Sequence, residues 1–343
     1  MPGLCIHSPV DDSFPAGGTG LAIRRCPEEK EAWAVTTGAA SSRRVIGPTE
    51  GVQRKWGAQS AVAPLRRALL CPPRWSEATM AGIDLGVWGY ASLPRLGEAQ
   101  AEFEALAEVL VRAGVEVLRH EEAQDGIYDA VFACDWGLVV NDGGIVLNPG
   151  KPARRPEADF AERAFLGAGV PIYHRMTAPA TAEGGDLLWL GPDLLLVGRS
   201  YRTNAAGLDE LQALLAPRGI SVAQAPVPHW EGQGSVMHLL SIISLVDSDL
   251  AVVYLPLLAV ETVEFLRERG VELLPVTGEE FGNLACNILA LGPRHCLAVA
   301  GNPRVRRELE RRGATVEEFP DRQLGLNMGG GPTCLVQAVL RDY

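Results

Sequence analysis

One pattern recurs five times along the chain and constrains its fold more than any other feature. Each copy is an amphipathic helical segment, then a glycine, then a short apolar strand: EFEALAEVLVRAGVEVL, FAERAFLGAGVPIY, LDELQALLAPRGISVA, TVEFLRERGVELL and RVRRELERRGATVEEF. A glycine leaves a helix through a left-handed turn at the least cost, so it marks the end of each helix. The repeat, 43 to 55 residues long, predicts stacked or radial units and is marked by Gly114, Gly169, Gly219, Gly270 and Gly313.

Pairs of apolar runs, split by turn residues, lie between the helical segments. Four of them predict β-hairpins: FACDWGLVVNDGGIVLNP, DLLWLGPDLLLVG, VMHLLSIISLVDSDLAVVYL and NILALGPRHCLAVA. The unit is therefore strand, strand, helix, strand. The fifth hairpin is not continuous, but we expect TCLVQAVL near the end of the chain to pair with APLRRALLCP near residue 65. That pairing would close a ring and remove exposed sheet edges.

We therefore predict an α/β protein, a five-bladed αβ propeller of ββαβ units with pseudo-fivefold symmetry. The propeller would be a single catalytic domain over residues 58–343. Residues 1–57 are rich in Gly, Pro, Ser and Thr and lack sustained periodicity. We interpret them as a disordered or artefactual N-terminal extension.

The composition limits the classes of function. With 47% hydrophobic and 21% charged residues, the 343-residue chain has the composition of a soluble globular protein with a sizeable core. The 31 basic and 42 acidic residues give a net charge of −11, which argues against a protein that tracks nucleic-acid phosphates. The same charge is compatible with a small cationic ligand.

The seven cysteines are scattered, odd in number and without a CxxC pair, so a complete disulfide framework is excluded. A reducing cytoplasm is the compartment this favours. The first residues show no secretory signal. The longest apolar stretch, LAVVYLPLLAV, is too short to span a bilayer, so we expect no membrane insertion.

Ionisable residues stand near the starts of the first strands of these units. If those strands run near the ring's axis, a thiol, an imidazole and carboxylates from different units converge there. Together they could supply a nucleophile, an acid/base group and an anchor for a cation. The residues are Asp135, Glu183, Asp186, His238 and Cys334.

Four ordered segments resemble a known family. They are VFACDWGLVVNDGGIVLNPGKPARRPE, EGGDLLWLGPDLLLVGRSYRTNAAG, HLLSIISL and GGGPTCLV. From about residue 58 to its end, the chain resembles the guanidino-group-modifying enzymes of the pentein fold, namely dimethylarginine dimethylaminohydrolases, amidinotransferases and arginine deiminases. The dimethylaminohydrolase-like branch is the most similar.

The resemblance implies a role for each catalytic residue. Cys334 would attack the guanidinium carbon, and His238 would protonate the departing amine and later activate water. Glu183 would orient His238 and help to hold the substrate. Asp135 would pair with the guanidinium nitrogens through charge-assisted hydrogen bonds.

The resemblance also implies how the rest of the substrate is held. Arg154 and Arg202 match the family's carboxylate-binding arginines, which suggests a substrate with a carboxylate as well as a guanidino group. Asp186 is a further candidate for substrate binding. Glu183 and Asp186 flank a Gly-Gly turn, however, and either could simply cap that turn.

Three glycines and Pro332 precede Cys334. The glycines would let the backbone bend and approach the substrate without Cβ clashes, and the proline would stiffen the approach to the thiol. A cysteine attacks as a thiolate. Two activation routes stay open, because either the site lowers the pKa of the thiol or the cationic substrate does so on binding.

Two positions depart from the family pattern. Cys134 stands where dimethylaminohydrolases commonly have a second carboxylate, and Leu240 stands where deiminases have an aspartate. We expect hydrolysis of an arginine-like or N-methylarginine-like compound to a citrulline-like ureido product and an amine. The alternatives are amidino transfer to an amine acceptor and a non-catalytic protein that binds guanidino compounds.

No HExxH motif or paired CxxC occurs, so we expect neither a metal nor a cofactor. The expected partner is a small guanidino molecule, with no nucleic acid and no membrane. A homodimer is a possible assembly.

Overall fold

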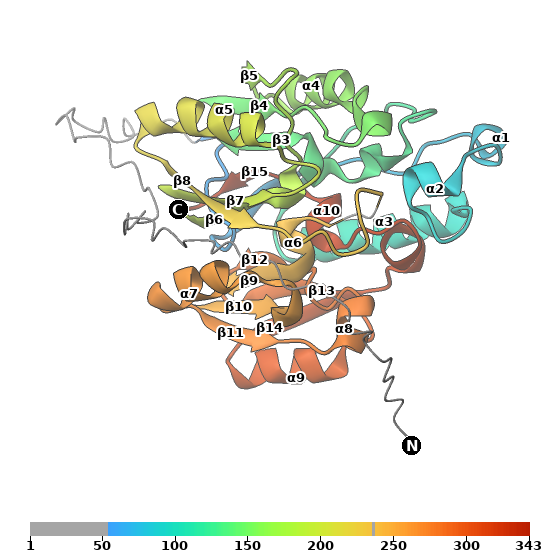
Figure 1. Cartoon of the computed structure of the whole chain (residues 1–343). Coiled ribbons are helices and arrows are strands. Elements are labelled where there is room, and N and C mark those ends of the chain that lie inside the picture. The colour runs from blue at the N-terminus through green and yellow to red at the C-terminus, as the bar shows by residue number, and fades with distance from the viewer. Residues whose placement is uncertain (1–53, 235–236) are drawn as a thin grey trace, which may run out of the picture. The chain divides into compact units, whose positions relative to one another are not determined.

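The computed structural model describes residues 54–234 and 237–343, which form a mixed α/β structure with five three-stranded sheets (Figure 1). In each sheet, the central strand pairs antiparallel with one neighbour and parallel with the other. A helix precedes each third strand. This is the strand, strand, helix, strand order that the sequence predicts.

The sheet that follows residue 136 illustrates the unit. Strand β3 (Gly137–Val140) pairs antiparallel with β4 (Gly143–Val146). Helix α4 (Glu157–Gly167) follows, and β5 (Ile172–Arg175) returns parallel to β4. The hairpin predicted in FACDWGLVVNDGGIVLNP is thereby confirmed.

Three further units repeat this order and confirm the other three hairpins. In each, the two hairpin strands come first, then the helix, then the parallel strand. Their elements are β6 (Leu187–Gly191), β7 (Leu194–Arg199), α5 (Ala205–Leu215) and β8 (Ser221–Pro226); β9 (Ile243–Asp247), β10 (Leu250–Val253), α7 (Val260–Glu268) and β11 (Glu272–Pro275); β12 (Leu289–Gly292), β13 (His295–Val299), α9 (Pro303–Arg311) and β14 (Thr315–Phe319).

The fifth sheet joins the two ends of the described fold. Strand β15 (Gln337–Arg341) pairs antiparallel with β1 (Leu65–Leu70), as the unpaired apolar runs predict. Helix α3 (Leu96–Arg112) then leads to β2 (Glu116–Arg119), which runs parallel to β1. The strand that follows Cys334 is therefore held in the interior of the fold.

The five repeat glycines all adopt the left-handed conformation that the pattern predicts. Their φ angles lie between +74° and +82°. Each stands between the helix of its unit and the third strand, so the chain reverses there and the strand joins its own sheet. Figure 1 shows α4, α5, α7 and α9 each beside the sheet of its own unit.

Short helical turns precede the first strands of four sheets, and here the structure differs from the expected continuous strands. These turns are Ala133–Trp136 before β3, Gly184–Asp186 before β6, α6 (Leu239–Ile242) before β9, and α10 (Pro332–Leu335) before β15. Cys134 lies in the first of them, rather than in a strand. The remaining α-helices of the described residues are α1 (Glu77–Met80), α2 (Leu85–Trp88) and α8 (Gly278–Gly282).

Apolar helix faces bury against the sheets and form the core. Phe160 and Phe165 of α4 are almost fully buried, as is Phe103 of α3. Burying one such side chain contributes about 1.5–3 kcal/mol. Gly137 and Gly144 leave room for Phe165, because a Cβ at either position would lie 3.0 or 3.2 Å from its ring.

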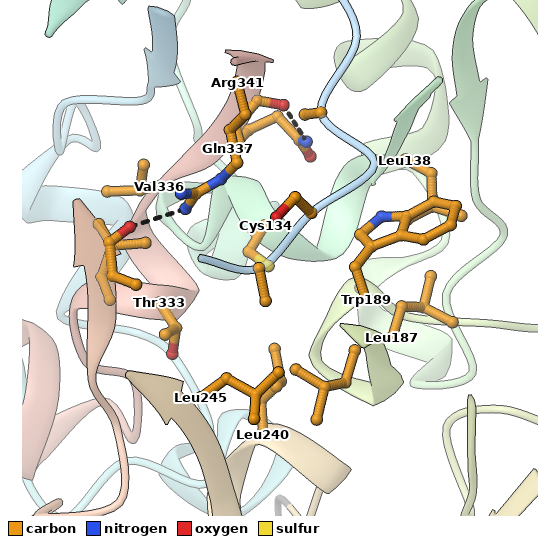
Figure 2. Close-up of a pocket in the computed structure, with 18 of the residues that line it drawn as sticks. Cys134, Leu138, Leu187, Trp189, Leu240, Leu245, Thr333, Val336, Gln337 and Arg341 are labelled. Atoms are coloured by element: carbon orange, nitrogen blue, oxygen red, sulfur yellow. Dashed lines mark hydrogen bonds between the residues drawn. The ribbon is translucent and has the colours of Figure 1, made fainter. Parts of the chain in front are cut away.

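One strand from each of the five sheets contributes to a common small cavity of about 110 Å³ (Figure 2). The strands are β3, β6, β9, β12 and β15. Each of them follows one of the short helical turns or, for β12, the turn that contains Cys286. The sequence predicts that these first strands meet at an axis. The cavity shows that residues from all five lie around one point.

The beginning of the described fold packs on its end. Gly57 N donates to Val339 O at 2.8 Å, and Arg341 N donates to Gly57 O at 2.9 Å. Most of the predicted extension, residues 1–53, lies outside the described residues, so its state stays a prediction. In the described part of the chain, no helix has the length and apolar character needed to cross a membrane.

Candidate active site

The polar residues predicted to converge all stand directly before first strands. Asp135 lies in the turn before β3, Glu183 precedes the turn before β6, and His238 precedes α6. Cys334 lies in α10, before β15. Because these strands meet around one point, their leading turns bring the side chains of distant segments together.

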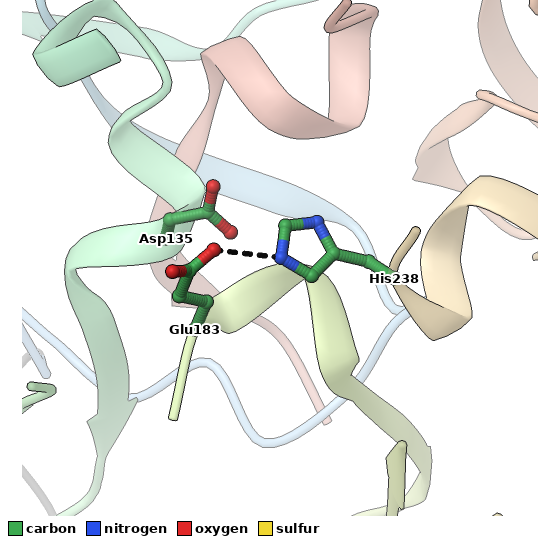
Figure 3. Close-up of side chains that lie close together, drawn as sticks. All are labelled: Asp135, Glu183 and His238. Atoms are coloured by element: carbon green, nitrogen blue, oxygen red, sulfur yellow. Dashed lines mark hydrogen bonds and ion pairs between the residues drawn. The ribbon is translucent and has the colours of Figure 1, made fainter. Parts of the chain in front are cut away.

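Asp135, Glu183 and His238 point toward one another (Figure 3). His238 Nε2 and Glu183 Oε2 are 2.8 Å apart and share a hydrogen bond. One polar atom from each of the three residues lies within 4.8 Å of the other two. The structure therefore places the predicted orienting carboxylate against the predicted acid/base.

The surrounding charges decide how this pair titrates. Burial alone would raise the pKa of Glu183, but Arg202, His238 and Arg154 outweigh it and hold that pKa well below its usual range. Burial opposes the charged form of His238, but the Asp135 charge, the hydrogen bond that His238 donates to Glu183 and the Asp186 charge raise the pKa of His238 above its ordinary value. The resting site therefore favours a carboxylate beside an imidazolium.

Arg154 and Arg202, the predicted substrate-binding arginines, are both bound to acidic residues. Arg154 donates to both oxygens of Glu157 and to Asp135 Oδ2, the last at 2.5 Å. Arg202 donates to Glu183 Oε2 at 3.1 Å. Both arginines are buried, and both line the pocket described below.

Asp186 is buried behind the site and does not line the pocket. Its two oxygens accept hydrogen bonds from Leu239 N at 2.9 Å and from Ser200 Oγ at 2.5 Å. Leu239 follows His238 directly, so Asp186 anchors the helical turn that carries the imidazole. The structure thus gives Asp186 partners other than the Gly-Gly turn, which was the alternative interpretation, and its role in substrate binding stays a prediction.

Cys334 receives a hydrogen bond from a residue that the sequence reasoning missed. Asn287 Nδ2 donates to Cys334 Sγ at 3.2 Å, and Asn287 Oδ1 accepts from Thr333 N at 2.9 Å. Burial raises the pKa of the Cys334 thiol, and the Asp135 charge raises it further. The bonds from Gly331, Asn287 and Thr333 oppose this rise without cancelling it.

Asn287 had a signal in the sequence. It stands two residues before β12, in the same place relative to a first strand as the other site residues. Asn287 was not among the predicted residues because those were ionisable, and an amide does not ionise. A prediction that took every polar residue just before a first strand would have included Asn287.

The glycines of the site permit close packing. A Cβ on Gly184 would lie 1.9 Å from Cys134 O, and one on Gly185 would lie 2.5 Å from His238 Nδ1. In the loop before Cys334, Gly329 has a φ of +91°, and a Cβ on Gly331 would lie 2.6 Å from the Asn287 side chain. At these glycines, the absence of a Cβ therefore lets the backbone pack closely against other protein groups, whereas the sequence predicts a close approach to the substrate.

The assembled residues line a pocket of about 700 Å³. Cys334, His238, Asp135, Arg154 and Arg202 all contribute to its wall, whereas Glu183 lies behind it. The wall also has an apolar part, made by Phe132, Trp230, Met237 and Phe281. This volume lies in the usual range for small-molecule sites.

Asp129 is a second wall residue that the sequence reasoning missed. Tyr90 Oη donates to Asp129 Oδ1 at 2.7 Å, and Lys151 Nζ donates to Asp129 Oδ2 at 2.6 Å. Lys151 Nζ also donates to Trp88 O at 2.7 Å. Asp129 thereby ties the segment that contains α2 to the pocket wall.

The group of Asp135, Glu183 and His238 has the atoms to ligate a metal ion. However, Arg154 already forms an ion pair with Asp135, Arg202 forms one with Glu183, and His238 Nε2 bonds to Glu183. A divalent cation would have to displace these partners beside two guanidinium charges. Of the two carboxylates in this group, only that of Asp135 lines the pocket, where it can contact a bound molecule.

The two departures from the family pattern lie outside the pocket. Cys134 and Leu240 line the small cavity between the five first strands instead. Neither contributes to the wall that contains Cys334. These two departures therefore do not change the wall of the pocket.

The chain is similar to known proteins over most of its length. The family model "N,N dimethylarginine dimethylhydrolase, eukaryotic" matches residues 95–341. The N(G),N(G)-dimethylarginine dimethylaminohydrolase of Streptomyces coelicolor is 32% identical over 208 residues, which cover 61% of this chain and 73% of that protein.

Solved structures share the fold. A cysteine-to-serine mutant of the dimethylarginine dimethylaminohydrolase of Pseudomonas aeruginosa, complexed with citrulline, superposes with a TM-score of 0.65 at 21% identity, covering 81% of this chain and 100% of that one. The N-terminal domain of ArgZ, a cyanobacterial arginine dihydrolase bound to substrate, gives 0.69 at 18% identity and covers 80% and 98% of the two chains.

Proposed function

The chain belongs to the dimethylarginine dimethylaminohydrolase family, and on that premise we propose that it hydrolyses a C–N bond of a guanidino compound through a covalent intermediate on Cys334. The products are a ureido compound, citrulline-like for an arginine-like substrate, and an amine. The substrate class is arginine or an N-methylarginine, with a carboxylate at its other end.

One observation carries this proposal. A single pocket presents a thiol, an imidazole bound to a buried carboxylate, and a second carboxylate that can anchor a cation. The reaction needs these groups as nucleophile, acid/base and anchor. They come from four different units of the fold.

Substrate binding generates the nucleophile. In the free protein, burial and Asp135 keep the Cys334 thiol protonated by raising its pKa. A guanidinium bound at Asp135 offsets that negative charge and adds a positive charge near the sulfur. The pKa of the thiol then falls, which favours the second of the two activation routes considered from the sequence.

The thiolate then adds to the electron-poor guanidinium carbon and forms a C–S bond. His238, whose raised pKa keeps it protonated, gives its proton to the nitrogen that departs. The C–N bond breaks with its electron pair on that nitrogen, which leaves as a neutral amine. An S-alkylthiouronium on Cys334 remains.

Water completes the turnover. Neutral His238 takes a proton from a water molecule, whose oxygen adds to the thiouronium carbon. Collapse of the adduct breaks the C–S bond and returns the electron pair to sulfur, and the hydroxyl proton of the adduct passes to that sulfur, which becomes a thiol again. The ureido product leaves, and Glu183 stabilises the imidazolium that has formed.

The two arginines have unequal freedom to bind a substrate carboxylate. Arg154 commits its Nε and one terminal nitrogen to Glu157, and its other terminal nitrogen to Asp135. Arg202 is bound chiefly through one terminal nitrogen, to Glu183. We therefore assign Arg202 as the main carboxylate anchor and expect Arg154 chiefly to position Asp135.

Hydrolysis is favoured over amidino transfer and over binding without turnover. The relatives named above are a dimethylaminohydrolase and an arginine dihydrolase. Cys134 and Leu240, the departures that motivated the binding-protein alternative, lie in the small cavity and not in the pocket.

The site also supports a proposal for the whole fold. The five sheets would be the blades of a propeller over residues 58–343, with the pocket at one end of its axis.

All five cysteines in the described residues are free thiols, in keeping with a reducing cytoplasm. A homodimer stays a proposal that sedimentation would test.

The test is mass spectrometry of the protein incubated with arginine, methylated arginines and shorter guanidino acids, with and without glycine as an amine acceptor. We expect a ureido product without the acceptor. Cys334→Ser should lose activity by at least about 10³-fold, because an alcohol is a far weaker nucleophile than a thiolate.

Cys134→Ser is the matched control, since it changes a neighbouring thiol outside the pocket. It should keep activity within a few-fold of the parent protein. New guanidino products that form only with glycine would replace hydrolysis by amidino transfer. Full activity of Cys334→Ser would refute the covalent mechanism.

A further inference from the structure

Arg341, at the end of β15, is a buried cation without an anionic partner in the part of the chain that the structure describes. It is 5% exposed, and its terminal nitrogens donate only to main-chain oxygens, Ala63 O and Ala290 O. Its Nε has no hydrogen-bond partner. Burial lowers the pKa of Arg341 to about 10, so the side chain is still charged at neutral pH.

An unpaired charge in the interior is costly. Carbonyl dipoles offset part of the lost hydration, but a buried arginine normally has a carboxylate or another anion beside it. Every other arginine buried to this degree in the described residues, Arg154 and Arg202, has a carboxylate partner. Arg341 is the exception, so its charge calls for an anion from solution.

Arg341 lies on the wall of the cavity between the five first strands. Figure 2 shows its guanidinium among Gln337, Val336 and Cys134, with Leu245 and Trp189 on other sides of the same space. The cavity measures about 110 Å³, which holds a small ion together with one or more waters. A large or multiply charged anion would lack both the room and a second cation.

Two other polar groups on the cavity wall have hydrogen-bonding capacity to spare. Ser60 Oγ accepts from Val62 N and Ala63 N, so its own hydroxyl proton is available to an acceptor. Gln337 Oε1 is buried without a donor among the described residues. Arg341 Nε–H and the Ser60 hydroxyl suit an anion, and Gln337 Oε1 suits a water beside it.

We propose that this cavity is a binding site for a small monovalent anion of the halide class, held by Arg341 with support from Ser60. The anion would neutralise the buried guanidinium at the point where the five sheets meet. Its binding would therefore stabilise the folded chain, because the unfolded chain has no such site.

The site is separate from the active pocket but adjoins it through the backbone. Cys134 and Thr333 line the small cavity, and the residues that follow them, Asp135 and Cys334, line the active pocket. Occupancy of the cavity would thus support the two turns that carry the anchor and the nucleophile.

The direct test is a crystal of the full chain grown or soaked in sodium bromide, with data collected at the bromine absorption edge. We expect an anomalous peak in the cavity within about 3.5 Å of Arg341 Nε. A peak height typical of a water molecule, with no anomalous signal, would overturn the proposal.

The second test measures thermal unfolding in sodium chloride and in sodium gluconate at equal ionic strength. Gluconate is too large for the cavity. We expect the melting temperature to be higher in chloride by roughly 3–8 °C. Arg341→Gln should reduce this difference to below about 1 °C, whatever its melting temperature in gluconate.

Arg66→Gln is the matched control, because it removes the same charge from an exposed side chain that pairs with Asp342. It should keep the full chloride effect. Equal chloride effects in both variants would show that chloride acts elsewhere and would overturn the proposal. If Arg341→Gln does not fold, the bromide crystal of the parent protein decides independently.

Discussion

At the scale of single residues, the pKa of the Cys334 thiol depends on burial and on two neighbours with opposite effects. Burial and the Asp135 charge raise this pKa, and the amide of Asn287 opposes the rise by donating to the sulfur. In the proposed mechanism, the charge of a bound guanidinium would supply the missing stabilisation of the thiolate. The thiol would then stay protonated until a substrate is present.

The pH dependence of thiol alkylation tests this balance. Iodoacetamide should modify Cys334 of the free protein with a midpoint above the ordinary cysteine pKa of about 8.5. Asp135→Asn should move the midpoint to lower pH, because it removes a negative charge. Asn287→Ala should move it to higher pH, because it removes a donor to the thiolate. Rates are followed by mass spectrometry of the Cys334 peptide.

The two variants serve as controls for each other. A general loosening of the pocket would move both midpoints in the same direction, toward that of a solvated thiol. Such a result would show that packing, not charge and hydrogen bonding, controls the reactivity of Cys334.

At the scale of elements, the helix and its terminating glycine form the repeating device. Helix α3 buries Phe103 and Leu106 against the sheet that closes the fold and ends just before Gly114. At Gly114, φ is +82°, which a residue with a Cβ adopts only with strain. A Cβ at Gly114 would meet no atom within 4 Å. Glycine is therefore needed there for its backbone conformation and not because space is short.

The two ends of α3 offer a paired test. Gly114→Ala should lower the free energy of unfolding by about 1 kcal/mol, through the left-handed backbone alone. Gly97→Ala, in the first turn of the same helix, should raise it by about 0.5 kcal/mol, because the unfolded chain loses freedom and the helix gains a better former. Urea denaturation measures both.

Gly97 is exposed, and a Cβ there also meets nothing within 4 Å, so the pair differs chiefly in backbone conformation. Destabilisation by both substitutions would mean that φ does not account for the role of Gly114.

At the scale of the whole molecule, buried ionisable groups away from the pocket also set stability. Asp321 precedes a π-helical turn, Arg322–Asn327, that leads to the glycine loop before Cys334. Glu102 of α3 accepts the N–H groups of Arg322, Gln323 and Leu324. Asp321 itself is buried, and both of its side-chain oxygens lack a partner in the described residues. Burial, helped by the nearby Glu102 charge, raises the pKa of Asp321 well above its ordinary value.

Linkage predicts a loss of stability with rising pH. Because the folded state binds this proton more tightly than the unfolded chain, stability falls as pH rises from the ordinary aspartate pKa toward the folded one. Asp321→Asn removes the titration. The free energy of unfolding of Asp321→Asn, relative to that of the parent protein, should rise as the pH rises above the ordinary aspartate pKa of about 3.9, by at most about 1.4 kcal/mol per pH unit in urea denaturation.

Asp342→Asn is the control, because that carboxylate is exposed beside Arg66. It should change the free energy of unfolding by less than about 0.5 kcal/mol, with no such trend. A pH-independent difference for Asp321→Asn would show that Asp321 is not the titrating group.

The order of elements and the pairing of the two distant apolar runs followed from the sequence, because periodicity and turn residues are local properties of the chain. Asp135, Glu183, His238 and Cys334 followed as well, since each stands just before a first strand, whereas Arg154 and Arg202 came from the family resemblance. The same rule, extended from ionisable to polar residues, would have included Asn287.

Tertiary packing decided which of these residues share a space. Glu183 faces His238 while Asp186 lies behind it, and Cys134 lines the small cavity while its neighbour Asp135 lines the active pocket. Likewise, only packing shows that Arg341 is buried without a carboxylate. The direction of a side chain from a short turn depends on the strands of other units around it. Local sequence determines that a turn exists, and contacts between segments far apart in the chain determine what it faces.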